Sequence, residues 1–279
     1  MSGKSLSALY LKATELLGSR FEAAQLLFHA TNTNENELRL RGGQLITEHG
    51  EAMLFSLCSR RLGGEPLQYL LGEWEFYSLP FRVGPGVLIP RADTEILVDT
   101  ALELIRDKQR PEIIDLCSGS GCIAIALAKH LPQAVVTAVE LSDQAFVYLS
   151  GNIALNNSAV RAIHTNALEY THEKKLDLVA SNPPYIPTND IDGLQDEVLH
   201  EPRLALDGGN DGLDFYREIA TKYYSQLAPG GWFCLEVGFD QAAQVQQLLR
   251  EQGCSSTATR RDLSGIERVV IAQKPCADI

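Results

Sequence analysis

The chain lacks the features that mark secreted and membrane-spanning proteins. Its six cysteines form no C-x-x-C pair and no closely spaced framework, which indicates reduced thiols and not a disulfide scaffold. No apolar run approaches the roughly 20 residues that a membrane helix needs. The first residues, MSGKSLSALYLKATELLG, carry charges within their apolar pattern and do not read as a signal peptide. We therefore expect a soluble, cytoplasmic protein without a membrane partner.

Basic residues are also scarce. The 24 Lys and Arg residues are outnumbered by 36 Asp and Glu residues, so the formal net charge is −12. Proteins that grip the phosphate backbone of nucleic acid usually present a clustered basic face, so this composition does not favour direct nucleic-acid binding. The six histidines are scattered without the spacing of metal ligands, and we expect no metal site.

Apolar residues are plentiful: 45% of the 279 residues are hydrophobic, enough for a sizeable core. Residues 1–73 show helical periodicity and predict a small helical domain. Residues 74–92 consist of short extended pieces separated by prolines and glycines, which predicts a hairpin-like linker. In the first predicted helix, LSALYLKATELL, one face carries Leu6, Leu9, Tyr10, Ala13, Leu16 and Leu17.

Residues 93–279 alternate between strand-like and helix-like runs, beginning at Asp93 as a predicted helix N-cap. The strand-like runs are EIIDLC, AVVTAVE, LDLVASN and GWFCLEVG, and the helix-like runs are CIAIALAKHL, SDQAFVYLSGNIALN, DGLDFYREIATKYYSQL and QAAQVQQLLREQG. Such alternation predicts an α/β fold with a parallel, doubly wound sheet. The last extended runs, TATRRDL and ERVVIAQK, predict an antiparallel hairpin at the far edge of that sheet.

The first candidate site follows the strand EIIDLC. The turn Ser118–Gly121 lets the backbone approach a ligand closely, and the helix that follows offers unpaired N–H groups to an anion. Glu140 ends the next strand, about 20 residues after the turn, where an acid usually binds ribose hydroxyls. These features predict a nucleoside cofactor. Residues 119–124 also fit the dinucleotide fingerprint G-x-G-x-x-A, so a dehydrogenase is an alternative at this point.

The second candidate site is the stretch Asn182-Pro183-Pro184-Tyr185 at the end of the fourth predicted strand. Its two prolines remove two backbone donors and fix two φ angles, so the turn is stiff. The side-chain oxygen of Asn182 and the carbonyl of Pro183 could together accept both hydrogens of a substrate –NH2 group. Tyr185 could lie flat against the planar group that carries it. Doubly wound sheets bind ligands at this edge, beside the glycine turn.

Together the two sites resemble class I methyltransferases that use S-adenosyl-L-methionine and act on planar nitrogens. Nearly the whole chain is similar to the bacterial release-factor glutamine methyltransferases, a Rossmann-like family with a helical N-terminal domain. The similar stretches are GEPLQYLLGEWEFYSLPFRVGPGVLIPRADTEILVD, NPPYIP, EPRLALDGGNDGLDFYREI and LEVGFDQ. The resemblance implies N5-methylation of the glutamine side-chain amide in the Gly-Gly-Gln motif of peptide chain release factors. It implies those factors as partners, docked by residues 1–73. Separately from the resemblance, we expect the protein to be a monomer.

The resemblance also assigns roles. Asn182 and Pro183 would be catalytic, residues 182–185 would bind the glutamine amide, and the segment IPRADTE would close over the cofactor. The residues implied in cofactor binding are Cys117, Ser118, Gly119, Ser120, Gly121, Glu140, Asn166, Ala167 and Asn182. Within that set Glu140 would take the ribose, and Asn166 with Ala167 would border the adenine. Three positions depart from the family pattern: Cys117 replaces a glycine, Ala92 a proline and Asn166 an aspartate.

Two other functions use the same residues. An adenine-N6 nucleic-acid methyltransferase would place an extruded base in the Asn-Pro-Pro-Tyr site, and the scarcity of basic residues weighs against it. A degenerate fold that binds the cofactor without turnover is the other, and the intact motifs weigh against it. Glu236, at the end of the fifth strand, could face either the cofactor pocket or solvent.

Overall fold

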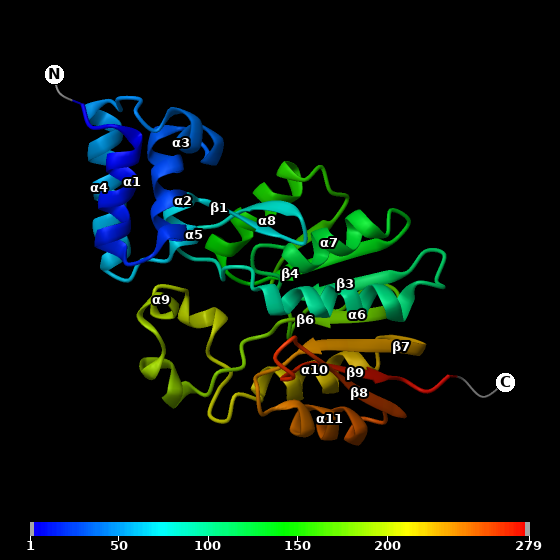
Figure 1. Ribbon diagram of the computed structural model, residues 1–279. Helices are drawn as coiled ribbons and strands as arrows, with labels where there is room; N and C mark the ends of the chain where they lie inside the picture. The colour runs from blue at the N-terminus through cyan, green and yellow to red at the C-terminus, as the bar shows by residue number, and fades with distance from the viewer. Residues whose placement is uncertain (1–2, 277–279) are drawn as a thin grey trace. The chain divides into compact units, whose positions relative to one another are not determined.

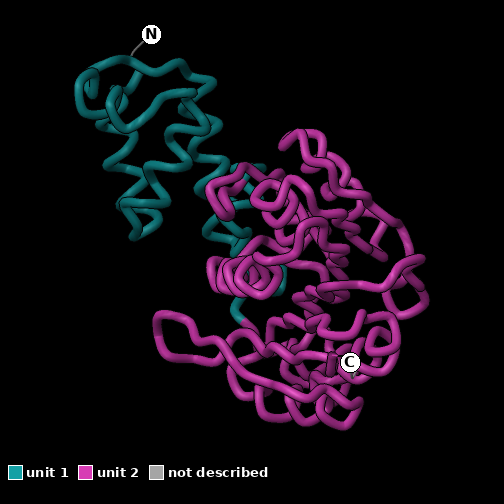
Figure 2. The backbone as a smooth tube through the Cα atoms, turned by 90° about the vertical axis from the view of Figure 1, so that its right-hand side faces the viewer, with its two compact units in different colours: residues 1–73, 195–200 teal, residues 74–194, 201–279 magenta. Residues whose placement is uncertain are grey.

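The computed structural model describes residues 3–276. The chain forms two compact units, shown in different colours in Figure 2. The first, here called the helical unit, comprises residues 1–73 and 195–200. The second, here called the sheet unit, comprises residues 74–194 and 201–279.

The helical unit is held together by apolar faces of short helices. Helix α1 begins after Ser5, whose side chain accepts a hydrogen bond from the Ala8 amide, and ends at Gly18 in the left-handed conformation. The predicted helix and its bounds are confirmed, but Leu16 lies at the edge of the apolar face and is 39% exposed. The helices of this unit are α1 (Leu6–Leu17), α2 (Arg20–Thr31), α3 (Glu35–Arg41), α4 (Glu48–Leu62), α5 (Leu67–Leu71) and α9 (Asp196–Leu199).

Helix α9 packs in the helical unit although it lies far along the chain. Arg61 of α4, with a side chain only 13% exposed, makes ion pairs with Glu22 of α2 and Glu197 of α9. A guanidinium removed from water in this way needs both carboxylates as partners. The Arg61–Glu197 pair therefore gives residues 195–200 a physical reason to pack against these helices.

A hairpin follows the helical unit. Strands β1 (Glu73–Phe76) and β2 (Leu79–Arg82) form a two-stranded sheet. The connecting residues, Tyr77 and Ser78, have φ values of 52° and 57°. Positive φ at both central positions is the geometry of tight turns that match the twist of paired strands.

The core of the sheet unit is a seven-stranded sheet with the order β5-β4-β3-β6-β7-β9-β8 (Figure 1). Strands β5, β4, β3, β6 and β7 run parallel, whereas β9 pairs antiparallel with both β7 and β8. The predicted doubly wound sheet and its antiparallel edge hairpin are therefore confirmed. The strands are β3 (Glu112–Leu116), β4 (Val135–Glu140), β5 (Arg161–His164), β6 (Leu176–Ser181), β7 (Leu227–Glu236), β8 (Ser256–Arg261) and β9 (Glu267–Gln273).

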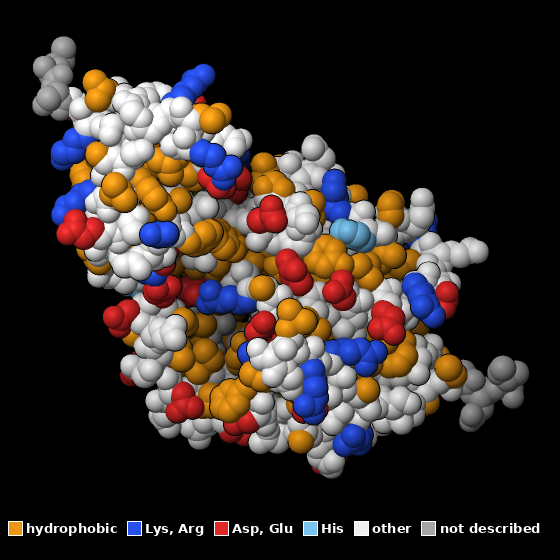
Figure 3. All heavy atoms as spheres, in the orientation of Figure 1, with side chains coloured by type: hydrophobic (Ala, Val, Ile, Leu, Met, Phe, Trp, Pro, Cys, Tyr) orange, Lys and Arg blue, Asp and Glu red, His pale blue; other side chains and the backbone are white. Residues whose placement is uncertain are grey.

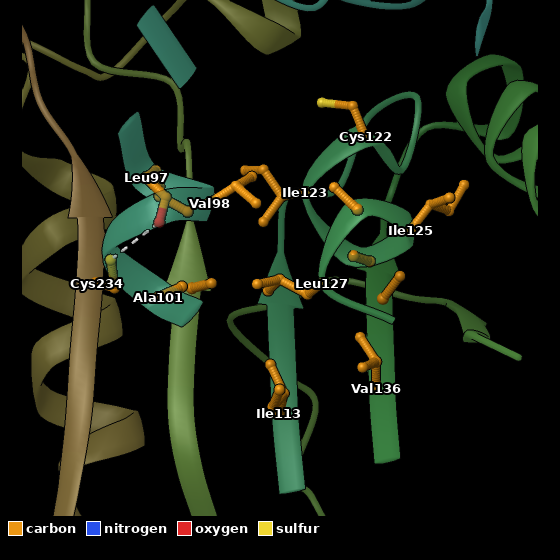
Figure 4. Packing of buried hydrophobic residues seen from close by; sticks show 14 of the residues in the cluster. Leu97, Val98, Ala101, Ile113, Cys122, Ile123, Ile125, Leu127, Val136 and Cys234 are labelled. Atoms are coloured by element: carbon orange, nitrogen blue, oxygen red, sulfur yellow. Dashed lines mark hydrogen bonds between the residues drawn. The ribbon is translucent and has the colours of Figure 1, made fainter. Parts of the chain in front are cut away.

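Helices cover both faces of this sheet because successive strand residues point to opposite sides. Ile113 of β3 packs into a core formed with α6, α7 and α8, part of which is seen in Figure 4. Its neighbour Ile114 packs into a second core formed with α10 and α11. The helices of this unit are α6 (Glu95–Ile105), α7 (Cys122–His130), α8 (Asp143–Leu155), α10 (Asp214–Tyr224) and α11 (Ala242–Glu251), with 3-10 turns η1 (Ala92–Thr94), η2 (Thr188–Gly193) and η3 (Arg203–Ala205).

The start of α6 differs from the prediction. Thr94, and not Asp93, occupies the N-cap position, and Asp93 lies inside the 3-10 turn that precedes the helix. The extra turn places Thr94, which is 2% exposed, in the interior. Within residues 3–276, no helix combines the length and the apolar character that a membrane crossing requires.

Candidate active site

The candidate active site is a pocket in the sheet unit, here called the strand-end pocket. It encloses about 820 Å³ of space free of atoms, part of it open to solvent. Cys117 follows β3, Glu140 ends β4 and Asn182 follows β6, so the pocket lies at the carboxyl ends of these strands. Its lining is drawn from within residues 86–94, 117–123, 140–145 and 182–184, together with Pro202, Leu204, Ala205 and Phe215.

The structure brings most of the predicted site residues to this pocket. Those in its lining are Cys117, Ser118, Gly119, Ser120, Glu140, Asn182 and Pro184. Those outside its lining are Gly121, Asn166, Ala167, Pro183 and Tyr185. The segment IPRADTE contributes Ile89, Pro90, Arg91 and Thr94 to the wall.

The turn between β3 and α7 needs glycine for two different reasons. Gly119 has a φ of 54°, and a Cβ there would find only Val87 Cγ2, at 4.0 Å. A side chain at this position would therefore extend into the pocket, and its absence keeps the space for a ligand. Gly121 has a φ of 81°, and a Cβ there would collide with Leu149 of α8. Gly121 thus serves helix packing.

Cys117 occupies a left-handed backbone conformation, with a φ of 57°. A residue with a Cβ is strained there, which accounts physically for the glycine that the family pattern has at this position. We expect Cys117→Gly protein to be more stable than Cys117→Ala protein by roughly 0.5–1 kcal/mol, because both lack the thiol and only alanine retains the strain. Urea unfolding of the two variants measures the difference, and equal stabilities would contradict the expected strain.

Glu140 connects the glycine turn to the loop after β4. It is 7% exposed, and its two carboxylate oxygens accept hydrogen bonds from the Gly119 amide (2.8 Å) and the Ser142 amide (2.7 Å). Each carboxylate oxygen has a second lone pair, so both can accept a further hydrogen bond from a ligand in the pocket. The arrangement suits a pair of neighbouring hydroxyls, such as those of a ribose.

Two acceptors of the Asn-Pro-Pro-Tyr segment have no donor among the described residues. Asn182 donates from Nδ2 to Thr94 Oγ1 at 3.4 Å. In the described part of the chain, no donor is hydrogen bonded to the Asn182 side-chain oxygen or to the Pro183 carbonyl. Because neither proline has an N–H, no local donor competes for them. Two acceptors beside the pocket are therefore available to a substrate –NH2 group.

The last residue of the segment, Tyr185, and the next residue, Ile186, are hydrogen bonded to later parts of the chain. The Ile186 amide donates to the Leu206 carbonyl (2.9 Å), and the Gly208 amide donates back to Ile186 (2.9 Å). The Tyr185 carbonyl accepts from Gln241 Nε2 at 2.8 Å. The Tyr185 side chain packs against the second core, and burial, followed by the negative charge of Glu236, raises its pKa to about 12. Its contact with a planar substrate group stays a prediction.

Asn166 and Ala167 stabilise the loop after β5. The Asn166 side-chain oxygen accepts from the Leu168 amide (2.9 Å), and its Nδ2 donates to Glu169 (3.2 Å). The Ala167 carbonyl accepts from the Tyr223 hydroxyl (2.7 Å). Their place beside an adenine stays a prediction as well.

Glu201 is a site residue that the sequence analysis missed. Its side chain is 1% exposed, accepts from the Ile89 amide at 3.0 Å, and pairs with Arg91. Ile89 and Arg91 both line the pocket, so Glu201 holds one of its walls. Neither periodicity nor spacing connects Glu201 with Ile89 and Arg91. The only signal in the sequence was that Glu201 begins EPRLALDGGNDGLDFYREI, one of the stretches that carry the family resemblance.

Two carboxyls that are not part of the pocket lining are buried. Asp115 accepts from the Ala124 amide (3.2 Å), and Glu236 is 3% exposed, so it does not face solvent. Within the described residues, one oxygen of each has no hydrogen-bond partner. Burial raises the pKa of each group to about 7. As for metals, no cluster of three or more His, Cys, Asp or Glu side chains suited to an ion occurs between residues 3 and 276.

Comparison with known proteins relates both parts of the chain to one group of enzymes. Residues 7–72 match the model of the PrmC N-terminal domain, and residues 92–210 match the methyltransferase small domain. The chain is 41% identical to the release factor glutamine methyltransferase of Geobacter sulfurreducens, over 94% of this chain and 92% of that one. It is 36% identical to the enzyme of the same name from Fusobacterium nucleatum, over 96% and 77%.

Solved structures support the fold. A methyltransferase from Pyrococcus furiosus superposes with a TM-score of 0.53 at 18% identity, covering 78% of this chain and 97% of that one. The hMettl16 catalytic domain superposes with a TM-score of 0.58 at 15% identity, covering 91% and 92%. These likenesses establish the methyltransferase fold of the sheet unit.

Proposed function

The chain belongs to the family of release factor glutamine methyltransferases, and from that premise we propose that it methylates a glutamine side-chain amide. The acceptor is the glutamine of the Gly-Gly-Gln motif of peptide chain release factors, the methylated atom is the amide nitrogen, and the methyl donor is S-adenosyl-L-methionine. The observation that carries this proposal is the pair of free acceptors, the Asn182 side-chain oxygen and the Pro183 carbonyl, beside a pocket with a buried carboxylate.

The pocket residues fit S-adenosyl-L-methionine. The space beside Gly119 stays open because the residue has no Cβ, and Glu140 retains two lone pairs for ribose hydroxyls. The backbone of residues 117–121 would hold the methionine end, and Asn166 with Ala167 would border the adenine. When bound, the cofactor supplies an electrophilic methyl group on a positively charged sulfur.

Positioning supplies most of the proposed catalysis. The amide nitrogen is a weak nucleophile because its lone pair is delocalised into the carbonyl. Asn182 and Pro183 would accept both amide hydrogens and so orient the nitrogen, which can contribute several kcal/mol. The same acceptors stabilise positive charge that develops on the nitrogen, and this interaction strengthens in the transition state. The proton that becomes acidic on methylation then leaves to water.

We further propose that the helical domain, residues 1–73, docks the body of the release factor, with residues 74–92 as a linker and 93–279 as the catalytic domain. The match of residues 7–72 to the PrmC N-terminal domain supports this division. In the structure the helical unit also contains residues 195–200, which follow the Asn-Pro-Pro-Tyr segment along the chain.

Nucleic acid is a less favourable substrate. On the face shown in Figure 3, the described Lys and Arg side chains are scattered among Asp and Glu side chains and do not merge into a continuous basic patch. This distribution agrees with the net charge of −12. A nucleic-acid methyltransferase would need phosphate contacts from clustered basic groups.

Methyl transfer from labelled S-adenosyl-L-methionine tests the proposed function. We expect label on a purified release factor and none on its variant with alanine in place of the Gly-Gly-Gln glutamine. An adenine-rich DNA is included, and label on DNA alone would replace the protein substrate with adenine. The chain itself carries Gly42-Gly43-Gln44, so a reaction without release factor controls for self-methylation. Cofactor binding without label on any substrate would favour a degenerate fold.

A further inference from the structure

The Asn-Pro-Pro-Tyr segment, residues 182–185, is anchored at its downstream end. Pro183 and Pro184 have no N–H, so neither can fix the backbone by donating a hydrogen bond. The carbonyl of the next residue, Tyr185, accepts a hydrogen bond from Gln241 Nε2 at 2.8 Å. No step of the proposed reaction uses Gln241, which is 6% exposed and outside the pocket lining.

The side-chain amide of Gln241 is fully hydrogen bonded within the protein. Its Oε1 accepts from the Gly238 amide (3.0 Å), and its Nε2 donates to the carbonyls of Tyr185 (2.8 Å) and Gly212 (3.3 Å). Both amide hydrogens therefore have an acceptor and the oxygen has a donor, which favours one of the two amide orientations. One buried side chain thus joins the loop after β6, the loop before α10 and the loop after β7.

Glycines of the same loops lie close against Tyr185. A Cβ at Gly208 would lie 2.7 Å from Tyr185 Cα, and one at Gly212 would collide with the Tyr185 carbonyl oxygen. A Cβ at Gly238 would lie 2.8 Å from Gln241 Oε1 and 3.5 Å from Tyr185 Cδ2 of the ring. The backbones of these loops can approach so closely only because they carry no side chain there. Hydrogen bonds and close packing together fix the position of one peptide unit.

We propose that Gln241 is a positioning residue: by fixing the Tyr185 peptide, it places the two acceptors of the segment where the substrate amide binds. The proposal rests on the proposed function and assigns to it a residue outside the pocket. The two prolines make the segment stiff, so a shift at Tyr185 is passed on to the Pro183 carbonyl and is not absorbed between them. A shift of about 1 Å at a reacting group can lower the rate roughly 100-fold.

Gln241→Met tests the role of the amide. Methionine has a similar length but no N–H group, so the Tyr185 and Gly212 carbonyls lose this donor. We expect kcat for methylation of the release factor to fall by roughly 10- to 100-fold. S-adenosyl-L-homocysteine should bind with an affinity within about threefold of wild type, because neither Gln241 nor Tyr185 lines the pocket. Gln244→Met makes the same change at an exposed position of α11 and should retain wild-type kcat.

The division of the loss between kcat and KM distinguishes positioning from docking. The two acceptors act most strongly in the transition state, so kcat and kcat/KM of Gln241→Met should fall together. Single-turnover methyl transfer, with release factor and S-adenosyl-L-methionine both saturating, measures the loss in the chemical step. Thermal unfolding gives the folded fraction at the assay temperature. A rise in KM at unchanged kcat would assign Gln241 to docking of the release factor and would overturn the proposal.

Gly208→Ala displaces the same peptide without removing a hydrogen-bonding group. Gly208 is not among the residues with positive φ, so alanine is not strained by its own backbone, but its Cβ would press on the Tyr185 backbone. We expect a similar loss of kcat with cofactor affinity retained. Combined with Gln241→Met, the loss should be smaller than the product of the two single losses, because both act on one peptide. Gly193→Ala, at an exposed site where a Cβ finds open space among the described residues, should retain wild-type kcat.

The outcomes separate this inference from the proposed function. Failure of the wild type to methylate the Gly-Gly-Gln factor would overturn the proposed function. An active wild type with a kcat for Gln241→Met within threefold of it would overturn the positioning role alone. Losses that multiply in the double mutant would overturn that role too, as would an affinity for S-adenosyl-L-homocysteine that falls as far as kcat. If Gln241→Met failed to fold, an unchanged kcat in Gly208→Ala would overturn the role in the same way.

Discussion

Replacing Asn182 with alanine is expected to lower turnover of the release factor by roughly 10²- to 10³-fold, while S-adenosyl-L-methionine still binds. The Asn182 side-chain oxygen is one of two acceptors available to the substrate amide, and none of the described residues occupies it. Without it the amide loses its orientation, and the developing charge on nitrogen loses a partner that strengthens in the transition state. Single-turnover methylation with saturating cofactor measures the loss, and calorimetry measures cofactor affinity.

The exposed Asn189, in the 3-10 turn that follows the same segment, provides the matched control. Asn189→Ala makes the same chemical change outside the pocket and should retain wild-type turnover. A kcat for Asn182→Ala within threefold of wild type would show that the amide oxygen does not act in the transition state. A rise in KM at constant kcat would assign Asn182 to substrate binding only.

The sheet could be predicted because buried parallel strands read as continuous apolar runs. β3 (EIIDL) and β6 (LDLVAS) are covered on both faces, and their sequences are correspondingly apolar. The carboxyl ends of parallel strands lie at the same edge of a sheet. Glu140, at the end of β4, and Asn182, directly after β6, could therefore be assigned to one edge from the sequence. The structure confirms that both line the same pocket.

Elements with little buried surface were harder to predict. Helix α3 has no buried residue, so apolar periodicity could not indicate it, and the polar run NTNENE reads as a break. A local signal was present: Asn34 and Glu37 form a reciprocal capping box. Helix α9 has no buried residue either, and its contacts with the helical unit include the Arg61–Glu197 ion pair, which joins positions far apart in the sequence.

Contacts between distant segments could not be predicted from local patterns. Glu201 supports the wall formed by Ile89 and Arg91, yet periodicity and motif spacing describe only neighbours along the chain. The sequence placed Glu236 correctly at a strand end and left its surroundings open. The 3-10 turn before α6 was likewise not part of the prediction of Asp93 as N-cap.

Replacing Glu140 with glutamine is expected to weaken binding of S-adenosyl-L-homocysteine by roughly 100-fold. Hydrogen bonds to a charged acceptor contribute about 1.5–3 kcal/mol each, and a glutamine retains one acceptor oxygen of the two. Its NH2 group would also face the Gly119 or Ser142 amide, both of which now donate to the carboxylate. Calorimetry measures the change in affinity. Asp143→Asn, a neighbouring acid with a side chain 94% exposed, controls for the lost negative charge.

The loss in Glu140→Gln has two possible origins, contact with the ribose or distortion of the glycine turn, and a second ligand separates them. An analogue of S-adenosyl-L-homocysteine without the ribose hydroxyls should bind wild type about as weakly as the complete ligand binds Glu140→Gln. If Glu140 is the ribose acceptor, the variant should bind the two ligands with similar affinity, because the interaction is already absent. A variant that still distinguishes them as strongly as wild type would assign Glu140 to the turn, and the ribose to another residue.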